Sequence, residues 1–224
     1  HNYDLKRHEV TRKIENNGVT QVEADFNTMF LDCKIIFDKL SKELFMTVIF
    51  SHNTPSYNPV KEFIESIDWD GVERLSFIGG AITSDTGTLA WRCLMVRKWI
   101  VGIIASIYGG VNELNFILVG GKNTGKTEFF KRLLPPELKV YFALSQLNRG
   151  KDDEILMCEK LIILNDEYGG KNKMDERNEK RLMAADRFDL RVPYGKGNET
   201  ILRIASLGGT CNDTGVLDDA TGNR

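Results

Sequence analysis

The sequence lacks the features that mark several large classes of protein. Its 30 lysine and arginine residues are balanced by 32 aspartate and glutamate residues, giving a net charge of −2 and a pI near 6.0. This balance excludes a chain that binds nucleic acid or an anionic membrane through its overall charge. Any contact with DNA must therefore come from a local basic surface, or from several subunits acting together.

Paired cysteines, clustered histidines and a long apolar run are also missing. The four cysteines are scattered without a CxxC pair, and the three histidines have no ligand-like neighbours. This pattern predicts reduced thiols in a cytoplasmic protein, with no disulfide framework and no metal held by histidine. The most apolar stretch, WIVGIIASIYGG, is too short to span a bilayer, and no signal peptide is recognised. We therefore expect no membrane partner.

The length allows one large core with a smaller accessory unit. We expect a mainly helical accessory region over residues 1–84 and a larger α/β domain over residues 85–224. Because the first residue is not Met and the last four are TGNR, both ends are treated as artificial and the second domain as truncated at its C-terminus. Within the first region, NPVKEFIESI predicts a helix that Asn58 caps and Pro59 opens.

The second region combines a long helix with short apolar strands. A helix is predicted from Thr86 to Tyr108, ended by two glycines. Its apolar stripe is expected to face the core and comprises Leu89, Trp91, Leu94, Met95, Trp99, Ile100, Ile103, Ile104 and Ile107. The runs NFILV, KLIILN and TILRIASL are apolar throughout, which is typical of strands covered on both faces. They predict a mostly parallel sheet flanked by helices.

Residues 116–136, FILVGGKNTGKTEFFKRLLPP, join one of these strands to a glycine-rich turn and a helix. The turn satisfies G-x-x-x-x-G-K-[ST] with Gly120, Gly121, Lys122, Asn123, Thr124, Gly125, Lys126 and Thr127. Glycines let successive backbone N–H groups converge on a phosphate, and the helix N-terminus adds partial positive charge. Lys126 is suited to the β- and γ-phosphates and the Thr127 hydroxyl to Mg²⁺. We therefore predict a site for a nucleoside triphosphate with Mg²⁺.

Polar residues follow two further strands. After LIILN, Asp166 is suited to the Mg²⁺ shell, and Glu167 to orienting and deprotonating the attacking water. The strand in TILRIASLGGTCN delivers Asn212 to its end, where it is a candidate sensor of the γ-phosphate or a residue of an ordinary turn.

Two short stretches resemble GTPase motifs. DEYG (166–169) fits D-x-x-G and NKMD (172–175) fits N-K-x-D. In GTPases these motifs lie on different strands with a helix and a further strand between them, whereas here they are nearly adjacent. ATP is therefore favoured over GTP.

A hairpin is predicted from DRFDLRVPYGKGNETILRI, with Lys196 between two glycines at its tip. Lys196 is a candidate contact for a nucleic-acid backbone, or else part of a solvated turn.

Together these pieces resemble the virulence-associated E family of phage and mobile-element proteins. Those proteins are P-loop ATPases related to superfamily 3 helicases and D5-type primase-helicases within the AAA+ group. The resemblance covers roughly residue 55 to the end. It is carried by the order of NPVKEFIESIDWDGVERL, LVGGKNTGKTEFFKRLLP, KDDEIL, LIILNDE, DRFDLRVPYG, LGGTCN and DDATGNR.

The resemblance implies roles for several of the candidate residues, though not for Asp166 throughout the family. Lys126 and Thr127 hold phosphate and Mg²⁺, Glu167 polarises the water and Asn212 is the sensor. Arg224 belongs to a pair of which one acts as an arginine finger toward a neighbouring subunit's ATP, with Arg187, Arg191 and Arg203 as alternatives.

The family also implies a homo-oligomeric, hexameric ring with ATP between subunits and single-stranded or forked DNA through its centre. Primase or other replication partners belong to the same expectation. Our leading hypothesis is an ATP-hydrolysing helicase motor. The alternatives are a non-helicase P-loop ATPase switch whose output is protein binding, and a regulatory protein that binds nucleotide without turnover.

Overall fold

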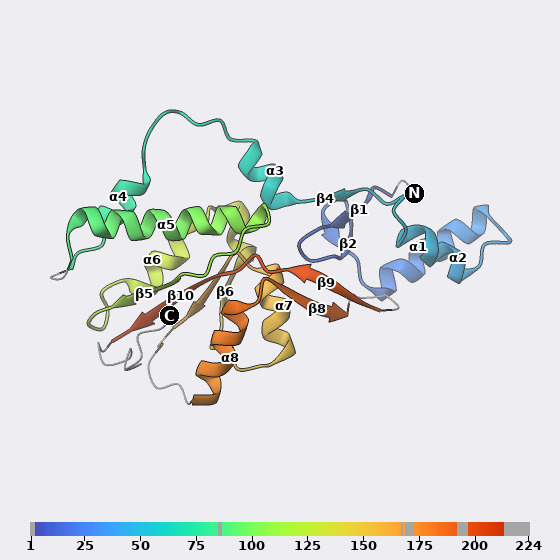
Figure 1. Cartoon of the computed structure of the whole chain (residues 1–224). Coiled ribbons are helices and arrows are strands. Elements are labelled where there is room, and N and C mark those ends of the chain that lie inside the picture. The colour runs from blue at the N-terminus through green and yellow to red at the C-terminus, as the bar shows by residue number, and fades with distance from the viewer. Residues whose placement is uncertain (1–2, 85–86, 167, 169–172, 192–196, 213–224) are drawn as a thin grey trace. The chain divides into compact units, whose positions relative to one another are not determined.

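The computed structural model describes residues 3–84, 87–166, 168, 173–191 and 197–212 (Figure 1). The chain divides into two compact units. One comprises residues 1–68 with 191–199, and the other comprises residues 69–190 with 200–224.

The first unit combines three helices with a small sheet. Its elements are β1 (Leu5–His8), β2 (Ile14–Asn16), β3 (Val19–Thr20), α1 (Glu23–Ile36), α2 (Lys42–Ile49), β4 (Ser56–Tyr57) and α3 (Pro59–Glu65). The strand order is β3-β2-β1-β4, and only the β1–β4 pair is parallel. The sequence analysis did not predict this sheet, because strands of two to four residues show too little alternation to be recognised.

Helix α3 begins where the sequence predicted. The Asn58 side-chain oxygen accepts hydrogen bonds from the backbone N–H groups of Val60 (3.2 Å) and Lys61 (3.1 Å), and Pro59 occupies the first turn. These N–H groups have no partner within the helix, so the cap satisfies them.

We expect Asn58→Ala to lower the free energy of unfolding of this unit by about 1 kcal/mol. Urea denaturation followed by circular dichroism would measure the change. Asn53→Ala is the matched control, because the Asn53 side chain is exposed and caps no helix. Equal stability of the two variants would contradict a capping role for Asn58.

The second unit is built on a four-stranded parallel sheet. Its elements are α4 (Leu75–Gly80), α5 (Leu89–Ile107), β5 (Asn115–Val119), α6 (Lys126–Leu133), the 3₁₀ helix η1 (Pro136–Tyr141), β6 (Phe142–Leu144), α7 (Lys151–Glu159), β7 (Ile162–Asn165), α8 (Lys173–Ala184), β8 (Arg187–Arg191), β9 (Asn198–Leu202) and β10 (Ser206–Cys211). The last residue of β8 and the first two of β9 belong to the first unit. The sheet order is β5-β10-β7-β6, with every pair parallel. Helices α5 and α6 lie on one side of this sheet and α7 and α8 on the other (Figure 1). The mixed α/β class with a parallel sheet is thus confirmed.

Helix α5 is present, but its predicted buried face was partly wrong. The buried residues are Val96, Trp99, Ile103, Ser106 and Ile107, whereas Leu89, Trp91 and Leu94 at the start of the predicted stripe are about half exposed (45–55%). The stripe failed because this helix is apolar on more than one side, and hydrophobicity alone did not show which side meets the sheet.

Aromatic rings fix α6 and α5 on one face of the sheet. The Phe130 ring is fully buried and lies 5.6 Å from Trp99 and 6.0 Å from Phe116, measured between ring centroids. The Trp99 indole N–H donates to the Leu207 carbonyl of β10 at 2.9 Å. Gly208 of the same strand leaves room for Phe130, because a Cβ there would lie 2.6 Å from the ring. The helix that follows the glycine-rich turn is therefore tightly positioned on β5 and β10.

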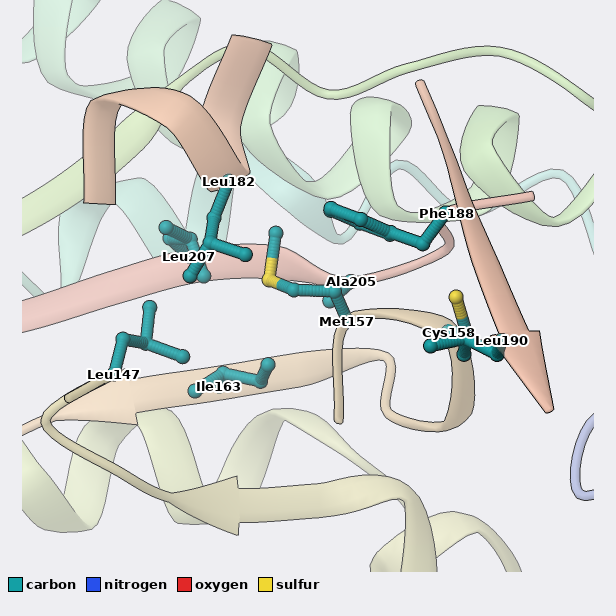
Figure 2. Close-up of a cluster of buried hydrophobic side chains, with 9 residues drawn as sticks. All are labelled: Leu147, Met157, Cys158, Ile163, Leu182, Phe188, Leu190, Ala205 and Leu207. Atoms are coloured by element: carbon teal, nitrogen blue, oxygen red, sulfur yellow. The ribbon is translucent and has the colours of Figure 1, made fainter. Parts of the chain in front are cut away.

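The opposite face carries an aliphatic core (Figure 2). Its buried members are Leu147, Met157, Cys158, Ile163, Leu182, Phe188, Leu190, Ala205 and Leu207. They come from β7, β8 and β10, from α7 and α8, from the loop after β6 and from the residue before β10. Strands β7 and β10 are therefore buried along their whole length, as their apolar composition predicted. The edge strands β5 and β6 are only partly buried.

The predicted two-stranded hairpin is also present as β8 paired with β9. Among the described residues, no helix is long and apolar enough to cross a membrane.

Candidate functional site

The glycine-rich turn connects β5 to α6 at the carboxyl edge of the parallel sheet. The Gly120 N–H donates to the Cys211 carbonyl at 3.1 Å, which ties the start of the turn to β10. Gly125 lies immediately before α6 with φ of 83°, a backbone conformation that favours glycine. Asn123 has φ of 61°, which asparagine tolerates better than most residues. At Gly120 and Gly121 a Cβ would meet nothing closer than Thr124, at 3.8 and 3.9 Å, so neither packing nor φ requires glycine there.

Lys126 lies over this turn and also reaches the next strand. Its Nζ donates to the carbonyl oxygens of Gly120 (2.7 Å) and Gly121 (2.6 Å). It also lies 3.2 Å from Oδ1 of Asn212, the residue that follows β10. The predicted lysine and the predicted sensor are therefore in direct contact.

Thr127 joins the turn to the strand that carries the acids. Its hydroxyl donates to Asp166 Oδ1 at 2.8 Å. The Thr210 hydroxyl of β10 donates to the same oxygen at 2.5 Å. Asp166 is half-buried and Thr210 is buried, so these contacts are shielded from water on one side.

The strand order explains why these residues meet. Parallel strands end at the same edge of a sheet, and side chains just after their carboxyl ends converge there. Here β10 lies between β5 and β7, so the turn after β5, Asn212 after β10 and Asp166 after β7 become neighbours.

Tyr168, two residues after Asp166, contacts β10 and β5. Its backbone N–H donates to the Thr210 carbonyl at 2.6 Å, and its ring lies against Gly209, where a Cβ would approach to 3.1 Å. Its hydroxyl accepts from the Asn115 side chain at 3.3 Å, and the same amide lies 3.2 Å from the buried carboxylate of Glu179. These contacts connect Tyr168 with β5 and, through Asn115, with α8.

Several predicted site residues lie outside the described residues, namely Glu167, Lys196 and Arg224. Of the remaining loop residues, Lys122, Asn123 and Thr124 are exposed, and the Thr124 hydroxyl donates to the Gly121 carbonyl at 3.0 Å.

Among the alternative arginines, Arg203 is only 1% exposed and donates to the carbonyls of Leu182 and Asn112. Burial also lowers the pKa of its guanidinium. A side chain enclosed in this way does not extend to a neighbouring subunit, whereas Arg187 and Arg191 are exposed.

Sequence reasoning missed one residue of the site, Thr210. The signal was available, because side chains two residues apart in a strand share a face, and Thr210 lies two residues before Asn212. It was overlooked because the strand around it is small and apolar.

The residues at this edge fit a Mg²⁺–triphosphate complex. Hydroxyl and carboxylate oxygens are ligands that Mg²⁺ prefers, and it is usually bound through one or two protein oxygens, with phosphates and water completing its shell. Thr127 and Asp166 supply such oxygens beside Lys126. Within the described part of the chain, no three histidine, cysteine or acidic residues are grouped to hold a metal by themselves.

The chain matches one protein family and is similar in fold to solved structures. The family model of the virulence-associated protein E-like domain matches residues 64–224. A structure of the apo A form of the NrS-1 C-terminal region is similar over 93% of this chain and 53% of that one, with a TM-score of 0.52 and 12% identity. A second structure of that region gives a TM-score of 0.49 and 15% identity over 98% and 52% of the two chains.

The chain thus spans about half the length of the solved structures it matches. At this level of identity the likeness concerns the fold. A search of curated proteins gives no match.

Proposed function

Because the chain belongs to the virulence-associated protein E-like family, we propose that it is an ATP-hydrolysing motor domain of a phage or mobile-element replication protein. One observation carries this proposal. Lys126 and Thr127, adjacent at the start of α6, contact Asn212 and Asp166 from two neighbouring strands. These two contacts support a site in which the turn binds phosphate, Thr127 and Asp166 serve the metal, and Asn212 senses the γ-phosphate.

The turn and α6 bind the triphosphate in this proposal. Backbone N–H groups of residues 121–127 and the N-terminus of α6 face the phosphate oxygens, while the Gly120 N–H remains bonded to Cys211. The Lys126 ammonium exchanges a carbonyl of Gly120 or Gly121 for a phosphate oxygen, which gains from the opposite charge. A Cβ at Gly120 or Gly121 would obstruct the bound phosphate. The phosphate therefore explains why glycine occurs at these positions, where the protein's own packing leaves room for a side chain.

The remaining residues support hydrolysis. Mg²⁺ held by Thr127 and Asp166 would neutralise charge on the β- and γ-phosphate oxygens. Glu167 orients the attacking water and accepts its proton, and Asn212 contacts the γ-phosphate beside Lys126. We propose ATP over GTP, because residues 173–175 of the NKMD stretch lie in the first turn of α8.

A surface groove supports the DNA part of the proposal. A cavity of about 490 Å³ lies beside α6 and β6, lined by Glu128, Lys131, Arg132, Lys139, Phe142 and Leu144. Its lining includes three cationic side chains and one carboxylate, of which Arg132 and Glu128 are paired at 2.8 Å, and the aromatic residue Phe142. Cationic side chains next to an aromatic ring suit the backbone and bases of single-stranded DNA. The Lys196 hairpin tip remains a second predicted contact.

The proposed assembly is a homo-oligomeric ring, hexameric as the family resemblance implies, with ATP between subunits and single-stranded or forked DNA through its centre. Arg224, Arg187 and Arg191 are then the candidates for a finger acting on a neighbour's ATP, because Arg203 is buried. Six modest basic surfaces around one channel would sum to a strong local field, which reconciles DNA binding with a net charge of −2.

The test is ATP hydrolysis with and without single-stranded DNA, together with sizing by light scattering. We expect hydrolysis that DNA stimulates and a particle of ring size. A Lys131→Gln, Arg132→Gln double variant should keep basal hydrolysis but bind DNA more weakly, with the slope of log affinity against log salt reduced by about 0.7 per lost phosphate contact. Lys98→Gln is the control, because Lys98 is exposed on α5 away from the groove.

The outcomes separate the alternatives. Hydrolysis that DNA does not change would favour a switch whose output is protein binding. Nucleotide binding without hydrolysis, even in the assembled state, would favour a regulatory protein. Absence of nucleotide binding would contradict the proposal altogether.

A further inference from the structure

Asp166 receives hydrogen bonds from two hydroxyl groups on different elements. One is Thr127 at the start of α6 (2.8 Å), and the other is Thr210 on β10 (2.5 Å). Both reach the same oxygen, Oδ1. Thr210 lies outside the glycine-rich turn and outside the acidic pair, so the proposed hydrolysis leaves it without a role.

The Thr127 and Thr210 hydroxyls differ in how freely they can rotate away from Asp166. Thr127 is in the first turn of a helix, next to the predicted phosphate site, and its hydroxyl is the one suited to Mg²⁺. Thr210 is 3% exposed and lies in a strand paired on both sides, opposite Leu118 of β5 and beside β7. A β-branched side chain in a paired strand has restricted χ1 rotation. Its hydroxyl therefore stays directed at Asp166 when Thr127 binds the metal.

The same strand also contacts the other half of the site. Asn212 follows Thr210 by two residues, and its side-chain oxygen lies 3.2 Å from the Lys126 ammonium. Residues two apart share a face of a strand. On this face Thr210 contacts Asp166, the proposed metal ligand, and Asn212 contacts Lys126, the proposed phosphate ligand. Gly208, two residues earlier on this face, accommodates Phe130 of α6, which holds the helix and its two motif residues against the same strand.

We propose that Thr210 is a positioning residue that orients the Asp166 carboxylate toward Mg²⁺. This inference rests on the proposed function, because it assigns the hydroxyl a role only if Asp166 serves the metal. Residues that hydrogen-bond a metal ligand typically change metal affinity by about 10- to 100-fold when removed. Thr210 thus acts through Asp166 and does not touch the nucleotide.

The test compares Thr210→Val, which removes the hydroxyl at nearly constant shape, with Thr210→Ser, which keeps it. For Thr210→Val we expect the Mg²⁺ concentration at half-maximal hydrolysis to rise about 10-fold or more. The affinity for a fluorescent ADP analogue in EDTA should not change, while the gain in that affinity on adding Mg²⁺ should shrink. Thr210→Ser should resemble the wild type in all three measurements.

Thr200→Val is the matched control. Thr200 also donates its hydroxyl to a strand aspartate, Asp189, at 2.6 Å, but both residues are exposed on the β8–β9 hairpin. This variant should leave the Mg²⁺ dependence unchanged. Thermal unfolding of each variant shows whether it is folded, and Thr210→Ala replaces Thr210→Val if the valine variant does not fold.

Two results would overturn the inference while leaving the proposed function intact. One is a wild-type Mg²⁺ dependence in folded Thr210→Val or Thr210→Ala. The other is an equal defect in Thr210→Ser, which would show that the hydroxyl is not the cause. If the wild-type chain neither binds nor hydrolyses ATP, the proposed function itself fails and this role falls with it.

Discussion

Replacing Lys126 with alanine should reduce ATP hydrolysis at least about 100-fold, the loss typical of removing one preorganised group that stabilises transition-state charge. The Lys126 ammonium lies 2.6–2.7 Å from two loop carbonyls and 3.2 Å from Asn212, where a γ-phosphate would develop negative charge during transfer. Phosphate release under steady-state conditions measures the effect.

The fold should survive this change. Lys126 is only half-buried and bonds to an exposed loop, so the thermal midpoint should move by no more than a few degrees. Lys98→Ala is the control, since it removes a lysine from an exposed helical position of the same unit. If Lys126→Ala hydrolysed ATP at the wild-type rate, the proposed nucleotide site would be wrong.

Replacing Gly208 with alanine should destabilise the second unit by about 3 kcal/mol, the upper end of the usual cost of adding a methyl group to a full core. The new Cβ would lie 2.6 Å from one carbon of the Phe130 ring and 3.0 Å from the next. That ring is held by Trp99, Phe116 and Phe129, at centroid distances of 5.5–6.0 Å, so it has little room to move. For a chain of this size we expect a drop in Tm on the order of 6–12 °C.

Two controls test the steric cause. Gly80→Ala, on an exposed helical position where the nearest outside atom is 4.0 Å from the new Cβ, should be neutral or slightly stabilising. Adding Phe130→Leu to Gly208→Ala should cost less than the sum of the single changes, because the smaller side chain relieves the contact. Strict additivity would argue against a clash between these residues.

Much of the site could be predicted from the sequence. The spacing of Gly125, Lys126 and Thr127 is a local pattern, and the helix that follows needs only neighbours in the chain. The position of Asp166 followed from a general property of parallel sheets, that residues after their strands meet at one edge. The contact between Thr127 and Asp166, 39 residues apart, agrees with that rule.

Other features could not be predicted in this way. Thr210 and Arg203 lie in a largely apolar stretch of sequence. The sequence did not show that Thr210 is buried at the site, or that the Arg203 guanidinium is enclosed among backbone carbonyls. The buried side of α5 was misassigned because aromatic and aliphatic residues occur on more than one side of it. The small sheet of the first unit was missed because its strands are very short.

The amino-acid sequence was sufficient for the glycine-rich turn, the cap of α3, the glycines that end α5, and the strands β5 and β7, because each depends on φ preferences, hydrogen bonds and burial patterns within a few residues. The run TILRIASL, predicted as one strand, is divided between β9 and β10 of different sheets. Only the tertiary structure decided that β10 lies between β5 and β7, and hence that Asn212 meets Lys126 from 86 residues away. Strand neighbours are chosen by how distant side chains pack, as Gly208 packs under Phe130. The order of strands in the sheet therefore cannot be predicted from local sequence patterns.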